Sequence, residues 1–343
     1  YALKIFSLLT KTKCFLTCAY YYKEDHEFAK ASIKNNIYFI ALHKEGITTP
    51  ITRLVRNNVF KYGCGPFHGS LILTQNQEEK ESLVYGNCFE KDKIVVTGCP
   101  RFDPYFNKDE KVKPRYFNKG FSLPSSDISQ LQNRKFDVVF FSFGPTSYLP
   151  VFRGNPKWPN FVNGKKIVPW DWSKLIHRYH KFIFDFADSN PNLDIALKVK
   201  QGYKLPLSIN NKNVPNNLKI FSTGEGGVLA SNAKVISAFN TTVIFESIAS
   251  KTPVIVPAFE EASLNNFQSE IGTLQLESAV DYAEDEEQFE KLILEKISNY
   301  KKTFRDFSDE DKQILKRYIG FYDGKSGLRT REAILRHIRE EEF

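Results

Sequence analysis

The sequence feature that most constrains the fold is a series of short, continuously apolar runs separated by longer polar stretches. In the first part of the chain, runs of strand length lie at residues 14–19, 37–42, 70–74 and 93–97. Helix-compatible polar sequence lies between them, at residues 22–34 and 76–85. A strand that is apolar on both faces is buried on both faces, which is typical of a parallel sheet covered by helices. This part therefore predicts an α/β layer.

A second series of the same kind begins at residue 135. Its apolar runs lie at residues 135–142, 195–199, 218–222, 234–238 and 253–257. A helix is expected at residues 172–188, and the tail from residue 284 onward is charged and helix-like. The second series therefore predicts another α/β sheet.

Between the two series, residues 107–134 are rich in Lys, Asn, Pro and Ser and have no period, which is typical of a linker. A chain of 343 residues is also longer than one typical domain. We therefore expect one α/β domain at residues 1–120 and a second α/β domain at residues 121–310. Helices at 311–343 could cross back onto the first domain or simply cap the second.

Composition limits the class of protein. Apolar residues make up 41% and charged residues 26% of the chain, as in globular proteins. Lys and Arg exceed Asp and Glu by 48 − 40 = 8, which favours anionic ligands such as nucleotides, phosphates, acidic sugars or anionic lipid. Zinc-finger spacing, RNP-type motifs and basic helical arrays do not occur in the sequence, so nucleic acid is not the expected partner.

Cysteine usage and hydropathy indicate the compartment. The five cysteines are odd in number and lack paired metal-type spacing, which favours free thiols in a reduced compartment. No apolar run reaches the ~18 residues of a membrane span, and the sequence does not open on a signal-peptide pattern. We expect a cytoplasmic protein, with peripheral contact to the inner membrane left open.

Residues 223–257 contain the most informative segment. A buried strand at residues 234–238 runs into Asn240, Thr241 and Thr242 at the start of a helix. Such a helix start presents unpaired N–H groups and a positive dipole end, which suit a phosphate. Glu246 follows one turn later, where a carboxylate can accept hydrogen bonds from ribose hydroxyls. In the alternative reading, these residues only cap a helix and Glu246 is solvated.

The order of a strand, N-T-T, F-E-S and K-T-P-V-I in this segment resembles the donor-nucleotide segment of GT-B glycosyltransferases. The resemblance is greatest to enzymes of capsule and lipopolysaccharide synthesis, including the retaining β-Kdo transferases that use CMP-Kdo. Related patterns occur in CDP-glycerol transferases and UDP-sugar 2-epimerases. Further segments that resemble the surface-carbohydrate family lie at residues 42–46 (LHKEG), 96–103 (VTGCPRFD) and 322–329 (YDGKSGLR).

The resemblance implies a GT-B-like α/β fold in which two Rossmann-like, doubly wound domains face each other across a cleft. Residues 1–120 would form the acceptor-side domain, and residues 121–310 would form the nucleotide-sugar-binding domain. It implies a glycosyltransferase that takes a nucleotide-sugar donor, with CMP-Kdo favoured, and a glycan or lipid-linked glycan acceptor. No cofactor is implied. A full GT-B lobe has more strands before the equivalent of residue 42, so the first domain is expected to be incomplete at its start or reduced.

Two carboxylates are the candidate catalytic groups. Glu45 follows a strand and precedes Gly46, so a tight turn would hold it as a general acid or base; it could instead pair with Lys44. Asp103 precedes Pro104, whose restricted backbone could aim the side chain into a cleft, although Asp-Pro also often opens a turn. The resemblance implies a retaining double displacement, with Asp103 as nucleophile and Glu45 as acid/base.

Further donor contacts are expected at the ends of two strands. Ser142 and Gly144 lie in the segment FSFGP at residues 141–145, where glycine lets a ligand approach the backbone. Lys198 and Lys200 share one strand face and could contact a diphosphate or a carboxylate, or they could be solvated. The His-Pro element that often occupies this region in the resembling enzymes is absent from the sequence.

A metal is not expected. His177 and His180 are spaced i, i+3 on a predicted helix without a third ligand in the sequence nearby, so we interpret both as helix-surface residues. Three functions remain open at this point. Sugar transfer would yield a glycoside and free nucleotide, epimerisation would yield an isomerised nucleotide-sugar, and a non-catalytic nucleotide- or glycan-binding protein would yield no product.

Overall fold

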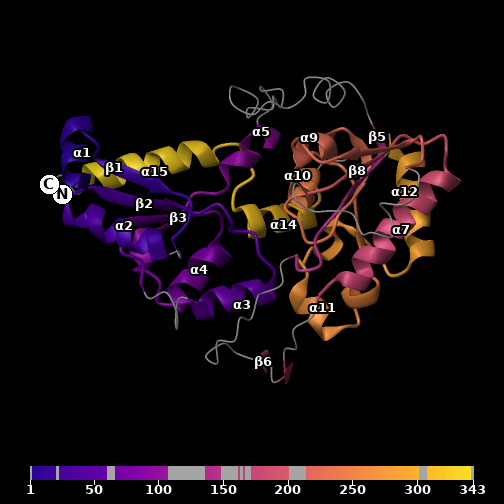
Figure 1. Cartoon of the computed structure of the whole chain (residues 1–343), viewed down its shortest axis with the longest axis horizontal. Helices are drawn as coiled ribbons and strands as arrows, with labels where there is room; N and C mark the ends of the chain where they lie inside the picture. The colour runs from indigo at the N-terminus through magenta and orange to yellow at the C-terminus, as the bar shows by residue number, and fades with distance from the viewer. Residues whose placement is uncertain are drawn as a thin grey trace. The chain divides into compact units, whose positions relative to one another are not determined.

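The computed structural model describes residues 2–20, 23–59, 66–106, 136–147, 161–162, 165–166, 171–200, 214–300 and 307–340. The expected linker at residues 107–134 lies outside them. The chain forms two α/β units (Figure 1). Unit 1 comprises residues 1–109, 150–167 and 315–343, and unit 2 comprises residues 110–149 and 168–314.

This division differs from the one expected from the sequence. The tail changes units at residue 315, inside α14 (Asp309–Ile319), so residues 315–343 belong to unit 1. The antiparallel hairpin of β6 (Phe161–Val162) and β7 (Lys165–Lys166) is also grouped with unit 1, although the boundary at residue 120 assigned it to the second domain. The sequence left open that the C-terminal helices cross back onto the first domain, but its composition did not indicate the return of the hairpin.

Unit 1 contains a parallel sheet whose strand order, β1-β2-β3-β4, follows the chain. These strands are β1 (Cys14–Thr17), β2 (Tyr38–Leu42), β3 (Leu71–Thr74) and β4 (Ile94–Val96). The helices are α1 (Ala2–Thr10), α2 (Lys23–Lys34), α3 (Pro50–Val59), α4 (Gln77–Tyr85), α5 (Asp103–Phe106) and α15 (Ser326–Glu340). Short 3₁₀ turns occur at η2 (Lys91–Lys93) and η3 (Pro100–Phe102).

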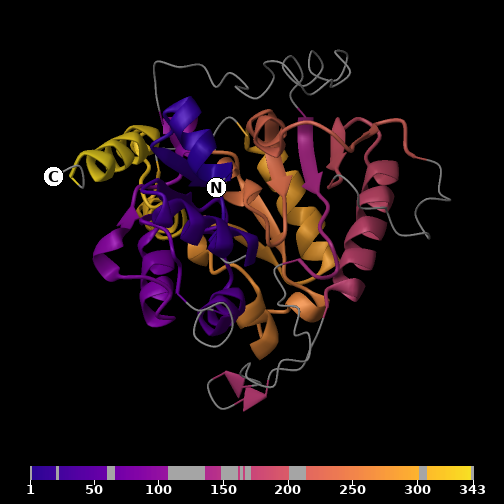
Figure 2. The ribbon, with the colours of Figure 1, turned by 60° about the vertical axis from the view of Figure 1, so that its left-hand side comes forward.

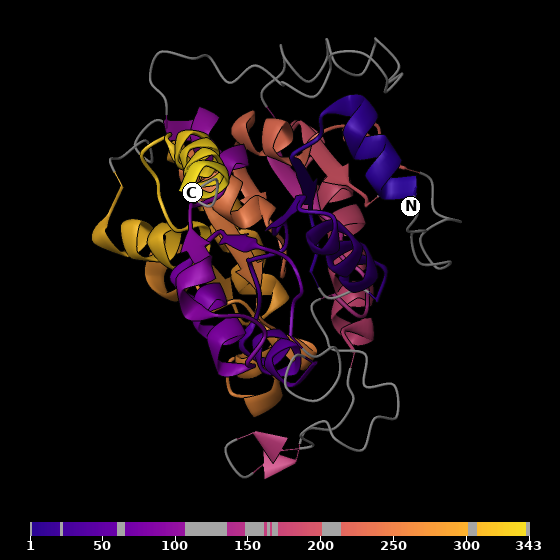
Figure 3. The ribbon, with the colours of Figure 1, turned by 90° about the vertical axis from the view of Figure 1, so that its left-hand side faces the viewer.

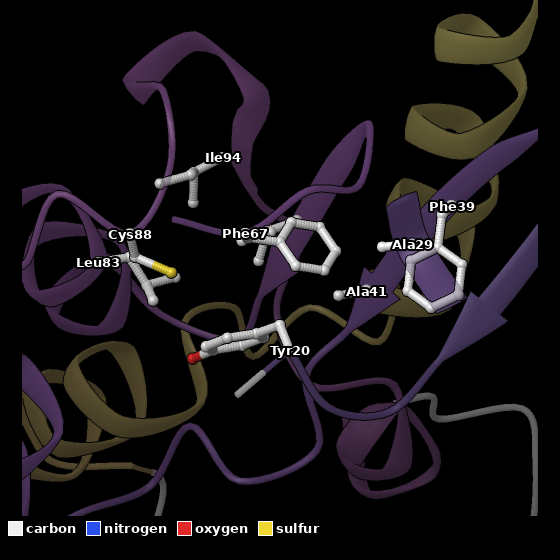
Figure 4. Close-up of a cluster of buried hydrophobic side chains, with 9 residues drawn as sticks. Tyr20, Ala29, Phe39, Ala41, Phe67, Leu83, Cys88 and Ile94 are labelled. Atoms are coloured by element: carbon white, nitrogen blue, oxygen red, sulfur yellow. The ribbon is translucent and has the colours of Figure 1, made fainter. Parts of the chain in front are cut away.

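The two faces of this sheet are covered by different parts of the chain. Ala29 of α2 and Leu83 of α4 pack with Phe39 and Ala41 on one face (Figure 4). On the other face, Ile40, Leu71 and Leu73 pack against Ala333 and Ile334 of α15. Figure 3 shows α15 in yellow, close to the strands of this unit. The C-terminal helix therefore completes the layer that the strand-connecting helices leave open.

Unit 2 contains a parallel sheet of order β12-β11-β10-β5-β8-β9. Its strands are β5 (Phe136–Phe141), β8 (Ile195–Lys198), β9 (Leu218–Phe221), β10 (Ala233–Ser237), β11 (Val254–Pro257) and β12 (Asp281–Ala283). Its helices are α7 (Ser173–Ser189), α9 (Gly226–Ser231), α10 (Val243–Ala249), α11 (Phe267–Gly272) and α12 (Glu286–Ser298). Short 3₁₀ turns occur at η5 (Glu260–Ala262) and η6 (Glu277–Ala279).

Alternating side chains of β5 supply both cores of unit 2. The Phe140 ring lies 6.5 Å from Phe182 of α7 and 6.3 Å from Phe289 of α12. The next residue, Phe141, lies on the side of α9 and α10, beside Gly226. Figure 2 shows α7 running along this sheet. Burying each such side chain stabilises the fold by ~1.5–3 kcal/mol, which explains why the strand is apolar on both faces.

The predicted strands are confirmed within one or two residues at most ends. The hairpin strands β6 and β7 and the short strand β12, which begins with an aspartate, were not predicted. Double winding is present in unit 2. In the described part of unit 1 the strands advance in one direction only, and α15 covers the second face. Among the described residues, no helix combines the length and apolar character that crossing a membrane requires.

Candidate functional site

The strand order of unit 2 creates one topological switch point. From β5 the chain moves outward to β8 and β9, then returns to the other side of β5 and moves outward again through β10, β11 and β12. The connections that leave β5 and β10 therefore diverge to opposite faces. In open α/β sheets the resulting crevice, at the carboxyl ends of the two strands, is where ligands bind.

Three segments converge at this point. Ser142 follows β5, and Asn240 follows β10 by three residues. Gly226, the first residue of α9, lies so close that an added Cβ would sit 3.3 Å from the Phe141 ring and 3.4 Å from Val243. A methyl group at Gly226 would press on the Phe141 ring by a few tenths of an ångström and would be in ordinary contact with Val243. The small residue is thus explained by the close approach of α9 to β5 and α10.

Asn240 has a structural function that the sequence interpretation missed. Its side chain is buried, its backbone has a φ of 45°, and its amide nitrogen donates to the Gly272 carbonyl at 2.8 Å. Its amide oxygen accepts from the Leu274 N–H at 3.0 Å. Both ends of the amide therefore bind the backbone at the end of α11, so this side chain holds the local fold, and its contact with a nucleotide stays a prediction.

The other residues of that segment are half-buried. Thr242 precedes α10 and forms no side-chain cap, and Thr241 and Glu246 are each partly exposed. At α7, by contrast, the Glu261 carboxylate accepts the N–H groups of Lys174 at 3.1 Å and Leu175 at 2.9 Å. An internal anion thus occupies the start of α7, whereas the side chain of Thr242 does not cap α10.

His180 is not on the helix surface, contrary to the prediction from its spacing. It is 1% exposed, and its Nε2 lies 2.9 Å from Ser142 Oγ. Burial lowers the pKa of His180 from 6.5 to about 4, so the imidazole is neutral near pH 7. The i, i+3 pattern was uninformative because one of the two histidines faces the core while His177 is exposed.

The remaining expected donor contacts have varied environments. Gly144 is buried, and its N–H donates to Ser147 Oγ at 2.9 Å. Lys198 Nζ donates to the Val199 carbonyl at 2.9 Å, and burial lowers the pKa of this ammonium group. Lys200 lies beyond the end of β8 and is exposed. Between the two lysines, Lys200 is therefore the one that solvent reaches most readily.

Glu225 was missed by the sequence analysis. It directly precedes α9 and Gly226, forms no side-chain cap, and is half-buried. Burial raises the pKa of its carboxyl group above the usual value. The glycines around it in TGEGG, at residues 223–227, were the available signal, because glycine-rich turns after a strand bring the backbone close to a neighbour or ligand.

A small pocket lies beside the ends of β10 and β11, with about 280 Å³ of empty space that includes open solvent. Its lining is mostly apolar and includes Phe239, Ile244, Leu264 and Leu276. Tyr282 also lines it, and burial raises the pKa of that phenol to about 12, so the hydroxyl stays protonated. The pocket offers apolar contact rather than charge.

In unit 1, the two carboxylates expected to be catalytic differ in exposure and bonding. Glu45 is exposed, and its carbonyl accepts from Arg56 at 2.8 Å. Both Asp103 oxygens accept backbone N–H groups at the start of α15, from Ser326 at 2.9 Å and Gly327 at 2.7 Å. Asp103 therefore joins the segments at residues 96–103 and 322–329, and it caps a helix.

The strand order also bears on the expected pairing of these carboxylates. Glu45 follows β2 and Asp103 follows β4, with β3 between them. At ~4.8 Å between neighbouring strands, the ends of β2 and β4 are ~10 Å apart. Retaining glycosidases hold their two carboxyl groups ~5 Å apart. The sheet alone therefore does not bring the two groups to that spacing.

A buried polar network lies between these positions. His43 Nδ1 and Glu79 Oε1 are in hydrogen-bonding contact, and Tyr20 donates to the same oxygen at 3.2 Å. The other Glu79 oxygen accepts the Gln75 N–H at 3.1 Å. Burial by itself would raise the pKa of Glu79, but His43, Arg56 and the Gln75 N–H together hold it below its usual value. A charged carboxylate is thus fully buried in unit 1.

This network supports the turn that carries Glu45. Gln75 Nε2 donates to the carbonyls of His43 at 3.3 Å and Lys44 at 3.0 Å. Asn76 Nδ2 donates to the carbonyls of Gly46 at 3.1 Å and Tyr318 at 2.7 Å. A side chain at Gly46 would collide with the Glu79 carboxylate. The LHKEG segment is therefore fixed from beneath by buried hydrogen bonds.

No protein-family model and no curated protein matches this chain. Solved structures do match it. The wall teichoic acid polymerase TagF, soaked with CDPG, is 12% identical and aligns over 96% of this chain and 73% of its own, with a TM-score of 0.56. The UDP-GlcNAc 2-epimerase of Methanocaldococcus jannaschii is 13% identical over 97% of this chain and 80% of its own, with a TM-score of 0.52.

The chain has a GT-B-like fold. At these identities the similarity concerns the fold alone. Within the described ranges, three or more His, Cys, Asp or Glu side chains do not gather as metal ligands would. Independence from a metal and from a cofactor stays a prediction.

Proposed function

We propose that this protein is a glycosyltransferase that binds a nucleotide-sugar at the switch point of unit 2. The observation that supports this most directly is the convergence of Ser142, Gly226 and the start of α10 at the ends of β5 and β10. Thr241, Thr242, Glu246, Lys198 and Lys200 are the further proposed donor contacts. A nucleotide suits this edge because parallel α/β sheets bind phosphates where a strand gives way to a helix.

The proposed donor is CMP-Kdo and the proposed acceptor is a capsule or lipopolysaccharide glycan. The support is the resemblance of the segments at residues 42–46, 96–103 and 322–329 to surface-carbohydrate enzymes, together with the positive net charge. Glu45 is the proposed acid/base because it is exposed on a turn held by buried hydrogen bonds. Asp103 is the proposed nucleophile of a retaining transfer, a function that would have to coexist with its cap on α15.

Two alternatives are favoured by a specific observation, namely the fold shared with a teichoic acid polymerase and a UDP-GlcNAc 2-epimerase. One is transfer from a CDP-glycerol-type donor, and the other is epimerisation of a UDP-sugar. A binding protein without activity is a further alternative. We place each of these reactions in the cytoplasm, with peripheral contact to the inner membrane left open for a lipid-linked acceptor.

A ligand screen tests the proposal. Thermal unfolding is measured with CMP, CDP, UDP and GDP, each at a concentration near 100 times the Kd of the best binder. A ligand of the native state stabilises it by ~2.7 kcal/mol at that ratio. Stabilisation by CMP that exceeds stabilisation by UDP supports the CMP-linked donor. Stabilisation by none of them would contradict the nucleotide site.

Product analysis then separates the reactions. With CMP-Kdo and an acceptor glycan, transfer yields a glycoside and CMP. With UDP-GlcNAc alone, epimerisation yields an isomerised UDP-sugar and no free UDP. Both assays are run with and without excess EDTA, and transfer is expected to persist when divalent metal is chelated. Loss of the rate in EDTA, with recovery on adding Mg²⁺ or Mn²⁺, would contradict metal independence.

A further inference from the structure

The two strands that flank the switch point are each held by a hydrogen bond from α7. Tyr179 donates to the carbonyl and the hydroxyl oxygen of Ser237, at the end of β10, at 3.1 Å each. The next residue, His180, bonds Ser142 just beyond β5 at 2.9 Å. Tyr179 and His180 are both buried, whereas Ser142 is half-buried. Ser142 is thus the member of this set that can meet a ligand.

The direction of the His180–Ser142 hydrogen bond depends on which imidazole nitrogen carries the proton. Near pH 7 the imidazole is neutral, because burial lowers its pKa to about 4, so it has one N–H. Nδ1 is buried and has no hydrogen-bond partner among the described residues. The Ile176 carbonyl, one turn earlier, offsets part of the pKa shift as a hydrogen-bond acceptor, although it lies outside the geometry of a normal hydrogen bond to Nδ1.

The two tautomers differ in cost. A proton on Nδ1 would face the Ile176 carbonyl only outside normal hydrogen-bonding geometry, so part of the desolvation cost of that buried N–H would not be recovered. A proton on Nε2 gives the donor an acceptor, Ser142 Oγ, and leaves only a lone pair on Nδ1. The second arrangement is therefore favoured. In it, Ser142 accepts from His180, and its own O–H is left to donate elsewhere.

We propose that His180 is a positioning residue that fixes Ser142 as a hydrogen-bond donor at the switch point, and that this hydroxyl donates to a phosphoryl oxygen of the bound nucleotide. This inference rests on the proposed nucleotide site. A phosphoryl oxygen is an acceptor without a proton to give, so it complements a hydroxyl whose lone pair is already engaged by an N–H. A ribose hydroxyl, by contrast, could bond Ser142 in either direction.

The first experiment determines the proton position directly. Nitrogen-15 NMR of selectively labelled histidine identifies the protonated nitrogen of His180 from its one-bond coupling to hydrogen, at pH 7. The signal is assigned by its absence in His180→Gln. A proton on Nε2 is the expected result. A proton on Nδ1 would overturn the inference, because Ser142 would then donate to His180 and have no O–H for a ligand.

The second experiment measures the Kd of CMP, CDP and UDP by calorimetry. Ser142→Ala is expected to weaken the tightest of them by about tenfold, the usual effect of one hydrogen bond to a charged group. His180→Gln can still donate an N–H toward Ser142 and should retain most of the affinity, whereas His180→Phe should not. Ser250→Ala, at the opposite end of α10, is the matched control and should bind as the wild type does.

The outcomes separate the inference from the function on which it rests. If a nucleotide binds the wild-type protein and Ser142→Ala binds it equally well, the inference is wrong and the nucleotide site stands. If no nucleotide binds the wild-type protein, the proposed site fails and the phosphoryl assignment fails with it. If His180→Phe does not fold, the NMR result still tests the proton position on His180, and the affinity of Ser142→Ala still tests the contact between Ser142 and the nucleotide.

Discussion

The sheet of unit 1 advances in one direction from β1 to β4, whereas the sheet of unit 2 turns back on itself between β5 and β10. Both are parallel, and both carry polar residues just past the ends of their strands. In unit 1 the second face is closed by a helix from the far end of the chain. In unit 2 the diverging connections create a switch point at the carboxyl edge.

The polar residues at the two edges are used differently. In unit 1, Glu79, Asn76 and Asp103 bond the backbone or buried side chains of the same unit. In unit 2, Ser142 and Thr242 are partly exposed beside the switch point. The comparison sets Asn76 and Asp103, which hold the loops of unit 1 in place, against Ser142 and Thr242, which keep part of their surface exposed in unit 2.

The largest expected effect is the loss of the buried carboxylate of unit 1. Glu79→Ala removes the acceptor for Tyr20, His43 and the Gln75 N–H. Breaking a buried, hydrogen-bonded pair in this way typically costs ~3–5 kcal/mol in the free energy of unfolding. Urea denaturation measures it, with Glu81→Ala in the same helix as the exposed control. A loss below ~1 kcal/mol would show that the network does not hold unit 1 together.

The next prediction concerns pH and the buried imidazole of unit 2. The pKa of His180 is lowered from 6.5 to about 4 in the folded protein, so between these values the unfolded chain binds more protons. The neutral His180 therefore contributes fully to the free energy of unfolding above pH 6.5. As the pH falls toward 4, up to ~3 kcal/mol of that free energy is lost. His180→Gln should flatten the stability profile of the wild type in this window. Identical slopes in the two proteins would contradict the buried, neutral imidazole.

The strands could be predicted because each one, buried on both faces, leaves a local apolar run. The roles of Asn240, Asp103 and His180 could not be predicted, because their partners lie 32, 223 and 38 residues away in the sequence. A short motif such as N-T-T shows that polar groups follow a strand. It does not show whether their hydrogen bonds go to a ligand or to the Gly272 carbonyl.

The three segments that resemble surface-carbohydrate enzymes likewise do not show by their sequence alone which groups their polar residues bind. Asp103, at the end of residues 96–103, binds the backbone of Ser326 and Gly327 in residues 322–329. Asn76 donates to the carbonyl of Gly46, the last residue of 42–46, and to the carbonyl of Tyr318 in α14, which precedes residues 322–329. Part of what the resemblance records is therefore a structural junction within unit 1. Which of these residues also act on a substrate has to be tested by substitution.

Asp103 allows the two functions of one residue to be separated. Asp103→Ala should lower the free energy of unfolding by ~1–2 kcal/mol, because the start of α15 loses its acceptor. Asp103→Ser retains a capping oxygen and should recover most of that stability, but it lacks a carboxylate nucleophile. Urea denaturation and the CMP-Kdo transfer assay are run on both variants. Transfer that persists in a stable Asp103→Ser protein would limit Asp103 to the cap and remove it from the mechanism.

The smallest expected effect lies on the unit 2 side of the comparison, at Glu246. It is half-buried one turn into α10, where its carboxylate is proposed to accept a hydrogen bond from a ribose hydroxyl. Glu246→Ala should weaken nucleotide binding by about fivefold, near 1 kcal/mol, with little change in unfolding. The effect should vanish when pyrophosphate, which has no ribose, replaces the nucleotide as competing ligand. Glu287→Ala, exposed on α12, is the control. Equal losses with nucleotide and pyrophosphate would mean that Glu246 acts through the shape of α10, and the ribose contact would be discarded.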